Sequence, residues 1–174
     1  MSIFEPDRLF ARITAIDIRR DLLDAGLDGV LLDIDNTIRS RETGAIPRDV
    51  GMWMGKARDA GISFCLLSNN WHSNVRELAR ELELPIVAKA CKPLPFAYMV
   101  AAHRLGLGRR RVVSVGDQLF TDVVGAHLAG VKAFMVLPLA EVDLKHTLWL
   151  RNLEHGIIGS REPEPVASCR EEAS

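Results

Sequence analysis

The chain has 174 residues, 48% of them hydrophobic and 26% charged, which is the length and composition of one globular domain with a core of its own. Its net charge of −1 offers no electrostatic basis for nucleic-acid binding, and no apolar stretch reaches the roughly 18 residues of a membrane span. The widely spaced Cys65, Cys91 and Cys169 argue against a disulfide framework or a zinc site and favour a cytoplasmic protein with reduced thiols.

The N-terminal region contains charged residues within its first ten positions, so no signal peptide is visible, and residues 7–25 predict one or two short helices. Short apolar runs then predict strands at 29–34, 62–67, 85–88, 112–115 and 133–137. Helical segments at 49–60, 73–84, 96–105 and 122–129 alternate with them and end at Gly or Pro. This alternation predicts an α/β fold with a mostly parallel sheet and helices on both faces, in three layers.

The C-terminal region has a different character. Residues 142–153 predict an amphipathic helix that closes the core, with a membrane-surface or partner helix as the alternative. Residues 159–174 contain two prolines and six charged residues, which predicts a disordered tail. We therefore expect a single domain over residues 1–158, followed by this tail.

Polar residues follow the predicted strands at the points where the strands end. They are Asp33 and Asp35, Ser68 and Asn69, Lys92, and Asp117 with Asp122. Because ligands bind outside the carboxyl ends of parallel strands, we expect these side chains to converge at one edge of the sheet. Four acids in one cleft repel each other, and Mg²⁺ with oxygen ligands relieves that repulsion. A hydroxyl, backbone amides and an ammonium suit a phosphoryl group.

The spacing of Asp33 and Asp35 adds a mechanism to this site. In an extended chain, residues two positions apart point the same way, so both carboxylates can flank one reacting centre. One can attack phosphorus while the other supplies a proton to the leaving oxygen. The pattern predicts Mg²⁺-dependent phosphoryl transfer through an aspartyl-phosphate.

Four stretches, "DIDNT", "LLSNN", Lys92-Pro93 and "GDQLFTD", resemble the four motifs of the haloacid dehalogenase (HAD) superfamily in their usual order. The resemblance implies that Asp33 is the nucleophile and a Mg²⁺ ligand. It implies that Asp35 is the general acid and base, with its backbone carbonyl on Mg²⁺. Thr37 would brace the first motif and belong to the phosphate-binding set with Ser68 and Asn69. An acid at position 35 favours a phosphatase over a dehalogenase.

For the third and fourth motifs, the resemblance assigns Lys92 to the lysine that offsets charge on the nucleophile and the phosphoryl group. Lys89 is a rival, but the proline after Lys92 fits a turn that opens the next helix. Asp117 matches a Mg²⁺ ligand, and Asp122 matches a second acid that supports the metal directly or through water. The implied architecture is the Rossmann-like HAD fold.

The gaps between the motifs are short. Only 30 residues separate Thr37 from Ser68 and 23 separate Ser68 from Lys92, which leaves no room for a cap domain. An open, capless site suits a bulky substrate. The length and motif wording resemble the YqeG family of HAD subfamily IIIA, which is related to mitochondrial phosphatidylglycerophosphate phosphatases. That resemblance implies a phosphatase for a lipid head group, peripheral to the inner face of the membrane.

Other interpretations remain open from sequence alone. A protein or nucleotide phosphatase would also use an open site, and a non-enzymatic HAD-fold module could bind a partner instead. Arg39 and Arg41, beside the first motif, suit either an anionic interface or plain surface charge. The order of the residues argues against a receiver domain, because in a receiver the lysine follows the acids and the hydroxyl, whereas Lys92 precedes "GDQLFTD". The sequence gives no indication of oligomeric state.

Overall fold

The structure is a computed structural model that describes residues 2–40, 42–70, 73–139 and 163–164. Its centre is a six-stranded sheet with the order β1-β6-β5-β2-β3-β4, in which every neighbouring pair is parallel. The strands are β1 (Arg8–Phe10), β2 (Gly29–Asp33), β3 (Ser63–Ser68), β4 (Ile86–Ala88), β5 (Val112–Gly116) and β6 (Lys132–Val136). The predicted α/β class with a parallel sheet is therefore confirmed.

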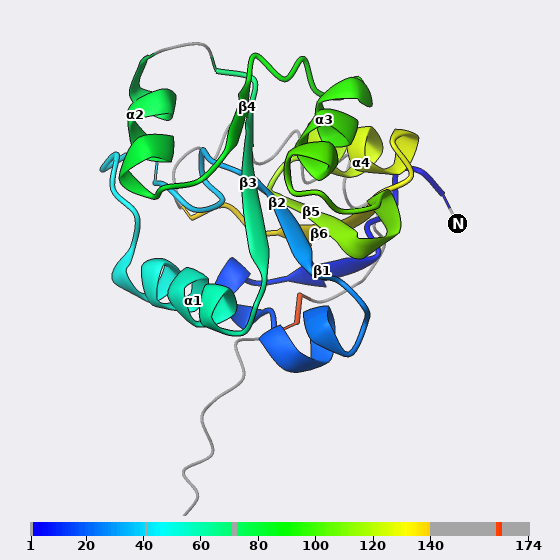
Figure 1. Ribbon diagram of the computed structural model, residues 1–174, viewed down its shortest axis with the longest axis horizontal. Helices are drawn as coiled ribbons and strands as arrows, with labels where there is room; N and C mark the ends of the chain where they lie inside the picture. The colour runs from blue at the N-terminus through cyan, green and yellow to red at the C-terminus, as the bar shows by residue number, and fades with distance from the viewer. Residues whose placement is uncertain (1, 41, 71–72, 140–162, 165–174) are drawn as a thin grey trace, which may run out of the picture.

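Helices cover both faces of this sheet (Figure 1). Helices α1 (Arg48–Asp59) and α2 (Ser73–Glu81) lie on one side, and α3 (Phe96–Arg104) and α4 (Val124–Leu128) lie on the other. Short 3-10 turns at Ile13–Ala15 and Arg109–Arg111 and π-helical turns at Ile18–Leu23 and Leu119–Val123 complete the described elements. The predicted three-layer architecture is confirmed.

The core consists of two apolar clusters, one on each face of the sheet. Val30 and Leu32 of β2 point into the cluster beneath α1 and α2, whereas Leu31 points into the cluster beneath α3 and α4. All three side chains are at most 1% exposed. Full burial of each such side chain stabilises the fold by roughly 1.5–3 kcal/mol. Burial on both faces explains why β2 is apolar without alternation.

The N-terminal region differs from the prediction. Residues 7–25 contain the expected helical turns, but they begin with β1, an edge strand that pairs with β6. The prediction of helices alone was wrong there, because β1 reads "RLF" and has only two apolar residues behind a charged one. Phe10 also forms a parallel bridge with Glu164, whose carboxylate pairs with Arg8. Glu164 lies within the predicted tail, while the predicted helix at 142–153 lies outside the described residues.

The order of the strands fixes the place of the site. From β2 the chain runs outward to β3 and β4 and then returns to β5 on the other side of β2. The carboxyl ends of β2 and β5 therefore form the point at which the topology switches direction, where ligands bind in open α/β sheets. Between Asp33 and Lys92 the described residues hold α1, β3, α2, β4 and their loops and no cap domain. Among the described residues, no helix is both long and apolar enough to cross a membrane.

Candidate active site

A buried ion-pair cluster lies at the carboxyl ends of β2 and β5. Asp33 is the last residue of β2, and Lys92, in the loop after β4, donates from Nζ to Asp33 Oδ1 at 2.5 Å. The same ammonium donates to Asp122 Oδ1 at 2.7 Å. All three residues are at most 8% exposed. One buried cation therefore holds two carboxylates that come from opposite halves of the sheet.

Three acids form a donor set of the kind that holds a metal ion. Asp33, Asp117 and Asp122 each offer a carboxylate oxygen, and these oxygens lie within 4.8 Å of one another. Asp117 directly follows β5, and Asp122 lies in the π-helical turn behind it, where its Oδ2 accepts from the Gln118 backbone amide at 3.1 Å. Hard divalent cations prefer such oxygen ligands, so the set fits the chemistry of Mg²⁺.

The electrostatics of the cluster show a surplus of negative charge. Burial raises the pKa of Asp33 from its ordinary value of 3.8 to about 7; the Asp122 carboxylate adds to the rise, and Lys92 opposes it. Burial lowers the pKa of Lys92, but the Asp122 and Asp33 carboxylates outweigh burial and raise it overall. Both directions follow from one ammonium shared between two carboxylates in a buried site. A further cation at this point would relieve the surplus.

Polar residues of the second motif line a hollow above the acids. Ser68, the last residue of β3, is 3% exposed, and its Oγ accepts from the Asn70 backbone amide at 3.1 Å. The Asn69 side chain is engaged elsewhere: its Oδ1 accepts from the Lys92 amide at 2.7 Å and its Nδ2 donates to the Lys92 carbonyl at 3.1 Å. Asn69 therefore fastens the lysine loop to β3. This role was not foreseen from the sequence.

The hollow has a volume of about 320 Å³. Its lining combines all four expected motifs, and the residues are Asp33, Asp35, Ser68, Asn69, Asn70, Lys92, Gln118 and Thr121. Gln118 and Thr121 were missed from the sequence, although both lie inside the "GDQLFTD" stretch that marked the site. Thr37 is not part of this lining, because it is 1% exposed and its Oγ1 donates to Asp33 Oδ2 at 3.4 Å.

The two candidate lysines occupy different environments. Lys92 is buried against Asp33, whereas Lys89 is exposed. Backbone φ angles of 55° at Lys89, 53° at Cys91 and 64° at Asn36 lie in the left-handed region, which non-glycine residues seldom adopt. Such conformations concentrate where surrounding contacts over-determine the backbone, and here they flank the first and third motifs.

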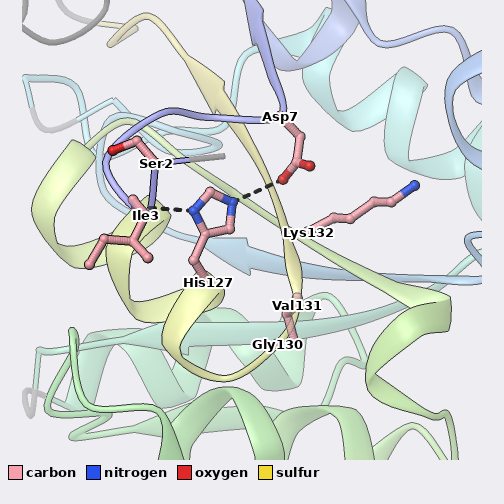
Figure 2. A pocket seen from close by; sticks show the side chains of 7 residues that line it. All are labelled: Ser2, Ile3, Asp7, His127, Gly130, Val131 and Lys132. Carbon is pink, nitrogen blue, oxygen red and sulfur yellow. Dashed lines mark hydrogen bonds and ion pairs between the residues drawn. The ribbon is translucent and has the colours of Figure 1, made fainter.

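A second hollow, of about 270 Å³, lies between the N-terminal segment and the end of α4 (Figure 2). His127 points into it, with Nδ1 3.0 Å from the Ile3 carbonyl oxygen and Nε2 3.0 Å from Asp7 Oδ2. Asp7 Oδ2 also accepts from the Ala133 amide of β6 at 2.8 Å. The imidazole is thus occupied in fastening the N-terminal segment to α4 and β6. This hollow shares no lining residue with the one over the acids.

Solved structures with the same fold include 4-nitrophenylphosphatase from Thermotoga maritima, with a TM-score of 0.60 and 12% identity over 81% of this chain and 94% of that chain. The cobalt-bound deoxy-D-mannose-octulosonate 8-phosphate phosphatase from Haemophilus influenzae has a TM-score of 0.54 and 14% identity, over 80% of this chain and 81% of that chain. At these identities the similarity extends to the fold.

Sequence relatives extend the comparison. Residues 89–138 match the model of the HAD-hydrolase-like family. The probable phosphatase YqeG of Bacillus subtilis is 30% identical over 158 residues, which are 90% of this chain and 91% of that protein. A match of this extent, with the shared fold, shows that the chain belongs to the HAD-like hydrolases, in the family of YqeG.

Proposed function

We propose that the chain is a Mg²⁺-dependent phosphomonoester phosphatase that works through an aspartyl-phosphate on Asp33. The observation that carries this proposal is the cluster at the switch point, in which Asp33 is buried beside Lys92, Asp117 and Asp122 under a polar hollow. Its relative YqeG, a probable phosphatase, supports the same reaction.

The residues present fit a divalent cation. Carboxylate oxygens of Asp33, Asp117 and Asp122 would hold it. The resemblance to the HAD motifs adds the backbone carbonyl of Asp35 as a fourth oxygen. A bound cation of this kind polarises a phosphoryl oxygen and offsets the charge that develops on it. The raised pKa of Asp33, caused first by burial and then by Asp122, supports a site built to accept positive charge.

The chain's own residues supply the remaining steps. An Asp33 carboxylate oxygen bonds to phosphorus as the bond to the leaving oxygen breaks, and Asp35 gives its proton to that oxygen. Asp35, now a carboxylate, takes a proton from water; the water oxygen bonds to phosphorus, and the bond to Asp33 breaks. Inorganic phosphate and the free Asp33 carboxylate are the products. Ser68 and Lys92 donate to the phosphoryl oxygens throughout.

The substrate we propose is a phosphate on a large molecule, with the head group of phosphatidylglycerophosphate as the first candidate. The absence of a cap domain among the described residues supports a substrate that is not enclosed. Exposed apolar side chains lie shortly after Lys92, at Leu94 in the loop and at Phe96, Met99 and Val100 in α3. They support a peripheral position at the inner face of the membrane. The reduced Cys65 and Cys91 suit the cytoplasmic side.

The test starts from activity on 4-nitrophenyl phosphate with Mg²⁺ or with EDTA, and Asp33→Asn is the control. We expect Mg²⁺-dependent turnover in the wild type and none in Asp33→Asn. Equal rates in the two proteins would leave the non-enzymatic binding module as the better explanation.

A second comparison concerns the substrate. Rates on phosphatidylglycerophosphate in vesicles are measured beside rates on phosphopeptides and nucleotides at equal phosphate concentration. We expect the highest kcat/KM on vesicles. A preference for phosphopeptides or nucleotides would replace the lipid with a protein or nucleotide substrate.

A further inference from the structure

Arg39 is paired with Asp35, the acid that faces the hollow. Arg39 Nη2 donates to Asp35 Oδ1 at 2.7 Å, and the two side chains are only 12% and 20% exposed. From sequence, Arg39 was a candidate for an anionic interface or a solvated charge. The structure gives it a partner inside the site, while Arg41 lies outside the described residues.

The backbone fixes the distance between the two residues. The Arg39 amide donates to the Ile34 carbonyl at 2.9 Å, and the Asn36 amide donates to the Arg39 carbonyl at 2.8 Å. Asp35 and Arg39 also form an isolated parallel bridge. The loop is closed on itself by these bonds, so the guanidinium starts from a fixed position and reaches one oxygen of the carboxylate. The ion pair therefore restrains the direction in which Asp35 points.

We propose that Arg39 is a positioning residue for proton transfer: it holds Asp35 Oδ1 so that Asp35 Oδ2 faces the leaving oxygen of the substrate. This inference rests on the proposed function, in which Asp35 is the general acid. In the first step the proton moves from Asp35 Oδ2 to the leaving oxygen as the phosphorus–oxygen bond breaks. In the second step Oδ2 takes a proton from the attacking water. Arg39 stays bonded to Oδ1 in both steps and touches neither phosphorus nor the leaving group.

The proposal predicts a dependence on the leaving group. General acid catalysis contributes about 10²–10⁴-fold where the leaving oxygen is strongly basic, because that oxygen cannot depart without a proton. A 4-nitrophenolate departs without this help, whereas the alkoxide of butyl phosphate does not. A carboxylate that is free to rotate spends time away from the leaving oxygen. Loss of Arg39 should therefore penalise the alkyl ester far more than the aryl ester.

The test measures kcat/KM of Arg39→Gln on both esters, because this constant reports the steps up to departure of the alcohol. We expect a fall of about tenfold or more with butyl phosphate and less than about threefold with 4-nitrophenyl phosphate. Arg39→Lys keeps a donor and should recover part of the loss. Arg111→Gln is the matched control, since it breaks an Arg–Asp pair with Asp28 at the opposite ends of β2 and β5.

A double-mutant cycle separates positioning from folding. In an Asp35→Asn background, Arg39→Gln should have no further effect on butyl phosphate, although it would still lower activity if Arg39 only stabilised the loop. An equal fall on both esters, or a rise in activity, would overturn the proposal. The proposed function fails separately, through activity that persists in Asp33→Asn.

Discussion

Replacement of Asp33 by Asn should stabilise the metal-free protein while it abolishes activity. The wild-type carboxylate is buried, and burial with the Asp122 charge raises its pKa from 3.8 to about 7. Each tenfold change in proton affinity corresponds to about 1.4 kcal/mol. Above pH 7, the raised pKa of Asp33 therefore lowers the free energy of unfolding of the wild type by at most about 4 kcal/mol. Because an amide imitates the protonated acid imperfectly, we expect a gain of about 2–4 kcal/mol in the free energy of unfolding.

The stability difference between Asp33→Asn and the wild type should depend on pH. Between pH 3.8 and about 7 the folded protein keeps the Asp33 proton while the unfolded chain has lost it. The stability that Asp33 contributes is therefore complete below pH 3.8, is lost as the pH rises through about 7, and is constant above that. The difference between Asp33→Asn and wild type should be near zero at pH 4 and greatest above pH 7.

Urea unfolding in EDTA, followed by circular dichroism from pH 4 to pH 8, measures this difference. Asp49→Asn is the control, since Asp49 is half-exposed and paired with Arg12 on the surface, and such changes stay within about 0.5 kcal/mol. A variant that is less stable than wild type at pH 8, or a difference that does not grow with pH, would refute the reasoning. Either result would mean that Lys92 fully compensates the buried charge.

Three further substitutions probe the parts that hold this site. Lys92→Met leaves Asp33 and Asp122 buried without their cation, so it should cost about 3–5 kcal/mol in EDTA by urea unfolding, and added Mg²⁺ should restore more stability than in wild type. Asn69→Ala removes two hydrogen bonds to the Lys92 backbone and should cost about 1–3 kcal/mol and lower kcat, measured by unfolding and by turnover of 4-nitrophenyl phosphate. Gly116→Ala would place a Cβ too close to Asp122 Cγ, so the Asp122 side chain must shift. This shift should raise the Mg²⁺ concentration for half-maximal activity on the order of tenfold, with little change at saturation.

Much of the fold was accessible from sequence because the strands are buried on both faces. β2 reads "GVLLD", an apolar run that ends in the acid of the site, and its neighbours share this form. The end of each run therefore marks both the end of a strand and the start of a functional loop. The exception is β1, which reads "RLF" with only two apolar residues, and which is a strand because it pairs with β6. Pairing with a neighbouring strand, and not the local sequence, determines whether such a short segment forms a strand.

The site, like the fold, has parts that the sequence predicts and parts that it does not. The convergence of Asp33, Lys92 and Asp122 follows from topology, because parallel strands bring their carboxyl ends to one edge. The contacts of Arg39 and Asn69 do not follow, because each depends on how a loop folds over a few residues. An arginine four residues after an acid can reach it from many loop conformations or from none. The backbone hydrogen bonds between Ile34 and Arg39 select the loop conformation in which Arg39 reaches Asp35.

Charge connects these observations to the reaction. Lys92 balances two carboxylates in the interior, Arg39 balances Asp35 at the mouth, and Asp117 adds a further acid beside Asp33 and Asp122. The interior therefore holds more anions than cations. A phosphate dianion entering it would meet repulsion from the acids that must act on it. A divalent cation on those acids would turn repulsion into attraction, so binding of phosphate should depend on prior binding of the metal. We expect Arg39 to stay with Asp35 in either state, because the Asp35 carboxylate already has Arg39 as its partner and lies outside the set of three carboxylates that could hold the metal.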